Sequence, residues 1–159
     1  MTNKLFLVCP FSSLENFIRT KYGNGTFFIT AMGTIFQFEE AEYLEPIQHL
    51  IECENITEIF VVSDTSCHCI NNALKNRMSC VSYSETVIQK LFKDNYASVM
   101  NEKKIEQQQI KLATLIVNYQ AKELKKPNCL KQQIIQNKIL IREVVTSKEI
   151  NQIIQLTHK

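Results

Sequence analysis

Two cysteines in this sequence stand directly after apolar runs, at points where buried strands would end. Cys9 follows the apolar run 5–8, and Cys67 follows the segment 59–66. Asp64 lies three residues before Cys67. Because the chemistry of open α/β sheets is concentrated at the carboxyl ends of strands, these three side chains are candidates for a shared site.

Two thiolates and one carboxylate, with water in the fourth position, would form a tetrahedral zinc site of the open, catalytic kind. Other interpretations stay open. Asp64 could instead cap a helix that begins near Cys67, and that helix start would favour the Cys67 thiolate. His68 is a secondary ligand candidate, because residues adjacent in sequence do not easily bind one ion. Cys69 could be a substitute ligand, a redox partner of Cys67 or a packing residue. Cys9 and Cys67 could also be ordinary buried thiols.

The elements that must position these residues alternate between short apolar runs and helical periodicity. This alternation predicts an α/β fold, a mainly parallel β-sheet flanked by helices, in a single domain over residues 1–159. A proline at position 46 argues against an unbroken helix around it. The final segment from Ser147 is expected to form a short helix. The expected strands are 5–8, 26–31, 59–62 and 139–145, and the expected helices are 14–22, 38–51, 84–91, 102–124 and 129–135.

Composition excludes several classes of protein. The chain has 159 residues with 45% hydrophobic side chains, and 3 Gly and 3 Pro are too few for a collagenous or linker-dominated protein. A formal net charge of +2 gives no reason to expect nucleic acid or a membrane surface as a partner. The start of the sequence lacks the pattern of a secretory signal, so the six cysteines are expected to be reduced and the protein cytoplasmic.

The segment 59–74, IFVVSDTSCHCINNAL, resembles the metal-binding segment of the β-class carbonic anhydrases. That family has a strand, then His-x-x-Cys, then the start of a helix. Cys67 matches the family cysteine, while Asp64 stands where the family has histidine. The segment 5–13, LFLVCPFSS, resembles the family's first strand and its Cys-x-Asp-x-Arg motif, with Cys9 on the cysteine.

The resemblance covers most of the chain and implies a β-carbonic-anhydrase-like core without the N-terminal helical arm of larger members. It implies a zinc ion held by Cys9, Asp64 and Cys67, with His68 and Cys69 as weaker candidates. It also implies a homodimer or a larger homo-oligomer. If the protein is active, the substrate would be a small molecule such as carbon dioxide or bicarbonate.

The departures from the family motif concern catalysis. The Asp-Arg pair that orients the zinc-bound water is replaced by Phe11 and Ser13, and Phe11 is expected to fill the space of that pair. A carboxylate in place of histidine adds negative charge, which makes zinc a poorer Lewis acid. Carbon dioxide hydration is therefore expected to be weak, altered or absent.

Three functions remain as hypotheses. The first is a divergent zinc-binding member of this family with weak or altered activity. The second is a non-catalytic homologue that acts in binding or assembly. The third is a thiol-redox protein that uses Cys67 and Cys69, since a Cys-x-Cys pair at a helix start can be reactive.

Overall fold

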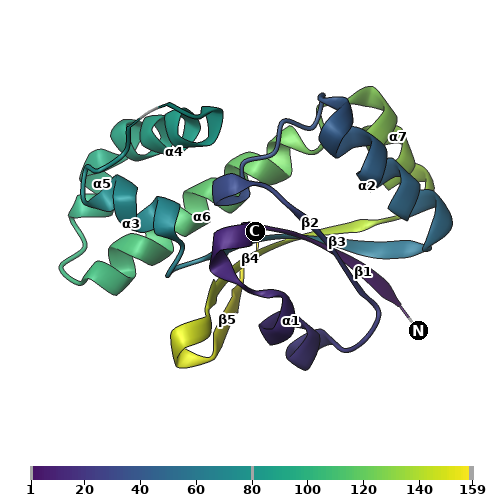
Figure 1. The fold of residues 1–159 in the computed structure, drawn as a ribbon, viewed down its shortest axis with the longest axis horizontal. Coiled ribbons are helices and arrows are strands. Elements are labelled where there is room, and N and C mark those ends of the chain that lie inside the picture. Colours follow the sequence, from purple (N-terminus) through teal and green to yellow (C-terminus); the bar gives the residue numbers. More distant parts are fainter. Residues whose placement is uncertain (1, 80, 158–159) are drawn as a thin grey trace.

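The computed structural model of the chain describes residues 2–79 and 81–157, and a five-stranded sheet lies at its centre (Figure 1). The strand order is β2-β1-β3-β4-β5, in which β1 to β4 are parallel and β5 is antiparallel to β4. This arrangement confirms the predicted mainly parallel α/β sheet. The strands are β1 (Asn3–Val8), β2 (Thr26–Thr30), β3 (Ile56–Asp64), β4 (Leu140–Ser147) and β5 (Gln152–Gln155).

The helices connect the strands as the periodicity predicts. Helix α2 runs through Pro46 without a break, because Ile47 and Ile51 beside it are buried in the core and the proline itself is exposed. No helix in the described ranges is long and apolar enough to span a bilayer. The α-helices are α1 (Glu15–Tyr22), α2 (Ala41–Cys53), α3 (His68–Leu74), α4 (Tyr83–Asp94), α5 (Tyr96–Met100), α6 (Ile105–Glu123) and α7 (Asn128–Gln136), and the 3-10 turns are η1 (Pro10–Ser12), η2 (Met32–Thr34) and η3 (Lys148–Ile150).

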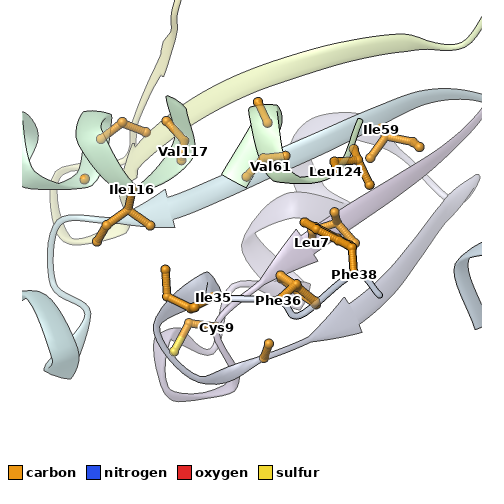
Figure 2. Close-up of a cluster of buried hydrophobic side chains, with 14 of the residues drawn as sticks. Leu7, Cys9, Ile35, Phe36, Phe38, Ile59, Val61, Ile116, Val117 and Leu124 are labelled. Carbon is orange, nitrogen blue, oxygen red and sulfur yellow. The ribbon is translucent and has the colours of Figure 1, made fainter. Parts of the chain in front are cut away.

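The two faces of the sheet carry different cores, because successive side chains of a strand point to opposite faces. In β1, Leu5 and Leu7 join the larger core under α2, α6 and α7, whereas Phe6 and Val8 join a smaller core with α1. Figure 1 shows α1 on the opposite side of the sheet from α2, α6 and α7. Figure 2 shows part of the larger core, in which Leu7 and Cys9 belong to the same layer.

The end of the chain differs from its prediction. The helix expected from Ser147 is a single 3-10 turn, and the chain then reverses at Asn151 and adds β5 to the sheet. Asn151 adopts a left-handed φ of 55°, which permits this tight turn. The strand has only Ile153 and Ile154 as apolar residues, so its pairing with β4, and not its own pattern, determines it.

Candidate metal centre

Three cysteine sulfurs converge at the carboxyl end of the sheet. Cys9 directly follows β1, Cys67 is the N-cap of α3, and Cys69 lies in the first turn of that helix. Their sulfur atoms all lie within 4.8 Å of one another. The three residues are 1%, 2% and 4% exposed. We call Cys9, Cys67 and Cys69 the three-cysteine cluster.

The topology of the sheet explains why these residues meet. Strands β1 and β3 are parallel neighbours, so the residues that follow them arrive at the same edge. A tight turn after β3, in which the Cys67 N–H donates to the Asp64 carbonyl at 3.0 Å, starts α3 at once. Two sulfurs of the cluster therefore come from a single helix start, and the third comes from the adjacent strand.

Gly33 in η2 closes the cluster from a third segment. Its backbone N–H donates a hydrogen bond to Cys9 Sγ at 3.2 Å. A Cβ atom at this position would lie 2.5 Å from Ile88 Cδ1 and 3.5 Å from Cys69 Sγ, and its φ is 64°. The left-handed backbone favours glycine here, and a side chain would have to displace the end of Ile88.

The three thiols of the metal-free protein share their protons unequally. Hydrogen bonds from the Cys67 and Cys69 thiols, together with the Gly33 N–H, hold the pKa of Cys9 far below its usual value. Cys69 donates to Cys67 and thereby lowers the Cys67 pKa. The hydrogen bond that Cys67 gives to Cys9, its burial and the Cys9 charge nevertheless raise its net pKa to about 11. The pKa of Cys69 is raised because its thiol donates to Cys67 and Cys9 and is buried. Cys9 is therefore the thiolate of the cluster at neutral pH.

This charge distribution predicts how stability depends on pH. The folded pKa of Cys9 lies below its unfolded value, so its stabilising contribution is present above the unfolded pKa and is lost as the pH falls. The free energy of unfolding of the metal-free protein should therefore fall between about pH 9 and pH 6, by at most about 1.4 kcal/mol per pH unit from this group. Urea unfolding at several pH values measures it. The Cys9→Ser variant should lose this slope, and an equal slope in both proteins would contradict the assignment.

Asp64 lies outside the cluster. It continues the row of Phe60 and Val62 in β3, which faces the smaller core, whereas Cys9 continues the row of Leu5 and Leu7 toward the larger one. Its carboxylate is fully buried.

Hydrogen bonds occupy both oxygens of that carboxylate. Oδ1 accepts from the Ser66 N–H at 2.9 Å and from the Ser66 hydroxyl. Oδ2 accepts from the Thr146 hydroxyl at 2.6 Å and from the Lys148 N–H at 3.1 Å. Asp64 thus joins the ends of β3 and β4. It caps no amide of α3, and its carboxylate is not among the ligand atoms that gather at the cluster.

Comparisons with known proteins connect this arrangement to a fold. No protein-family model and no curated protein sequence matches the chain. Solved structures do match. A tetrameric β-carbonic anhydrase from Sordaria macrospora superposes with a TM-score of 0.83 at 14% identity, over 99% of this chain and 81% of that one. The β-carbonic anhydrase CafA of Aspergillus fumigatus gives 0.82 at 13% identity, over 98% and 75%. A Coccomyxa β-carbonic anhydrase in complex with acetazolamide gives 0.78 at 12% identity, over 98% and 72%.

The chain has the β-carbonic anhydrase fold. This result agrees with the fold expected from the resemblance of the segments around Cys9 and Cys67. At these identities the likeness concerns the fold, and the chemistry of the site depends on the residues of this chain.

Two residues that depart from the β-carbonic anhydrase motif lie at the surface. Phe11 in η1 is 59% exposed, and its occupation of the space of the Asp-Arg pair stays a prediction. Ser13 is exposed and ends η1 in a left-handed conformation with a φ of 49°. The Lys148 ammonium donates to the Ser12 carbonyl, which ties η1 to the end of β4. Turn η1 is therefore held by its backbone, and its aromatic side chain is free to face solvent.

The remaining candidates near Cys67 differ in their placement within the β-carbonic anhydrase fold. His68 is exposed, and its Nε2 pairs with the Asn72 side-chain nitrogen at 3.0 Å. Cys69, the other secondary candidate, is buried with its sulfur in the cluster. The sequence feature that marks Cys69 as a candidate ligand is its two-residue spacing from Cys67 at a helix start. This spacing does not determine the direction of the Cys69 sulfur, which depends on the packing of α3 against η2.

Proposed function

We propose that this chain is a divergent β-carbonic anhydrase-like protein that binds one zinc ion through Cys9, Cys67 and Cys69 and hydrates carbon dioxide weakly or not at all. The observation that carries this proposal is the convergence of three buried sulfurs within 4.8 Å. Cys69 takes the ligand position that the sequence had assigned to Asp64. The carboxylate of Asp64 would have to give up four hydrogen bonds to serve there.

The chemistry of the donor set fits zinc. Thiolates are common zinc ligands, and three of them in a buried position are typical of sites that hold the metal tightly. Hydrogen bonds from Cys67 and Cys69 lower the pKa of Cys9, which favours its thiolate form as a first ligand for the cation. When bound, zinc supplies Lewis acidity and a pull on the electrons of a bound small molecule.

The same donor set argues against efficient hydration of carbon dioxide. Three thiolates donate more negative charge to the metal than ligand sets that contain neutral histidine, and this weakens its Lewis acidity. The positions where the family has its Asp-Arg pair hold an exposed Phe11 and Ser13, which offer no carboxylate to orient a water molecule.

A non-catalytic role in binding or assembly is the second candidate. One of the matched structures is described as tetrameric. We therefore propose a homo-oligomer, dimeric or larger.

Metal analysis together with a hydration assay tests the main proposal. The protein, purified under reducing conditions without chelators or metal-affinity resins, should contain about one zinc per chain. Zinc-loaded protein should hydrate carbon dioxide at close to the rate of the protein-free control. Absence of zinc, even after zinc is offered to reduced protein, would contradict the metal site. Rapid hydration would contradict the inactive assignment.

A further inference from the structure

The three-cysteine cluster offers an ion three sulfurs, and no His, Asp or Glu ligand atom of the described residues joins them. Asp64 is engaged by four hydrogen bonds, and His68 is exposed beside Asn72. The sulfurs are the only Cys, His, Asp or Glu ligand atoms among residues 2–79 and 81–157 that group in this way. An ion that needs four ligands must find the fourth outside this set.

The charge of the cluster is also distinctive. The groups that lower the pKa of Cys9 are two thiols and backbone N–H groups, all of them neutral. Three bound thiolates would therefore bring three negative charges into a buried position with no partner among those groups. A buried net charge is costly, so the cluster favours an ion that cancels it. A divalent ion leaves one negative charge, and a trivalent ion leaves none.

We propose that the cluster binds a trivalent thiophilic element, arsenic(III) or antimony(III), with one bond from each of Cys9, Cys67 and Cys69. This inference goes beyond the proposed function and rests on it in one respect, that the three sulfurs share one ion. A trivalent centre of this kind is complete with three sulfurs, because its lone pair occupies the fourth position. Soft thiolate ligands suit such an element.

The reaction is ligand exchange without oxidation or reduction. Arsenous acid, As(OH)3, loses three hydroxyls as three As–S bonds form and three As–O bonds break. The protons of the three thiols leave with the three hydroxyls as three water molecules. The product is a neutral As(S)3 centre in an apolar core.

The fold places the three sulfurs for this exchange in advance. Cys9 is held by the Gly33 N–H, and Gly33 packs against both Cys69 and Ile88. Once two sulfurs have bound arsenic, the third sulfur lies within 4.8 Å of both. It can therefore replace the last hydroxyl on arsenic in an intramolecular step. Among the residues that the structure describes, the two other cysteines stand outside the cluster: Cys53 is exposed and Cys129 is half-buried.

Intact-protein mass spectrometry with arsenite counts the sulfurs directly. The reduced, metal-free full chain should gain one arsenic atom and lose three hydrogens, since each As–S bond removes one thiol hydrogen. The Cys53→Ser variant is the matched control and should give the same adduct. Cys69→Ser should give no stable adduct, or one that retains a hydroxyl on arsenic. The wild-type mass alone decides the sulfur count if that variant fails to fold.

A wild-type protein that forms no adduct, or one that retains a hydroxyl, would overturn the inference. Zinc binding measured in parallel separates this failure from failure of the proposed function. A protein that binds zinc without forming the three-sulfur adduct contradicts only the arsenic inference. A three-sulfur adduct without zinc binding contradicts only the zinc assignment. Binding of neither contradicts both.

Discussion

Cys69→Ser is expected to lower the affinity of the protein for zinc by more than about 100-fold, since changes to groups that merely support metal ligands already cost 10- to 100-fold. The Cys69 sulfur lies in the three-cysteine cluster with Cys9 and Cys67. A serine hydroxyl is a harder and far less acidic donor, so two sulfurs would remain to hold the ion. Competition with a chromophoric zinc chelator, under reducing conditions, measures the change.

The matched control for this variant is Cys53→Ser. Cys53 ends α2 and is exposed, with its sulfur 3.7 Å from His49 Nδ1. Its replacement should leave zinc affinity unchanged within error, because it is remote from the cluster. Equal zinc affinity in Cys69→Ser and wild type would contradict the three-sulfur site. It would indicate that the zinc ligands do not include Cys69.

Asp64→Ala is expected to lower the free energy of unfolding of the metal-free protein by about 3–5 kcal/mol, because several donors lose their acceptor at about 1–3 kcal/mol for each buried one. The substitution leaves the buried Thr146 hydroxyl and the partly buried Ser66 and Lys148 N–H groups without their acceptor. It also removes the connection between the ends of β3 and β4. Urea unfolding followed by circular dichroism measures the loss.

The same variant tests the alternative ligand set. Folded Asp64→Ala should still bind about one zinc per chain if the ion is held by sulfur alone. Asp94→Ala is the matched control, because Asp94 is an exposed residue at the end of α4 and its removal should change stability by less than about 0.5 kcal/mol. Zinc lost from a folded Asp64→Ala protein would restore Asp64 as a ligand.

Much of the architecture follows from local patterns. The run 5–8 and the run 59–62 are continuous apolar stretches, and both form central strands of the sheet because residues buried on two faces must be apolar throughout. Parallel pairing of those strands then brings Cys9 and Cys67 to one edge. The likeness of these two segments to β-carbonic anhydrases indicates the fold from the sequence alone.

The site itself depended on contacts that no local pattern contains. Asp64 lies after a strand and before a helix, and an aspartate at such a position can be a metal ligand, a helix cap or a residue that anchors the loop. The local sequence is the same in all three cases. The Asp64 partners Thr146 and Lys148 are 82 and 84 residues away in the chain, so only the pairing of β4 with β3 selects among these roles. The short β5 was missed for the same reason, since its strand character comes from β4.

The sequence by itself determined that this is an α/β protein with a cysteine after each of two apolar strands, because hydrophobic periodicity involves residues close together in the chain. The tertiary structure alone decided that the third member of the cluster is Cys69 and that Asp64 faces away from it. Both outcomes depend on which distant segment packs against each side chain: η2 with Gly33 against Cys69, and the end of β4 against Asp64.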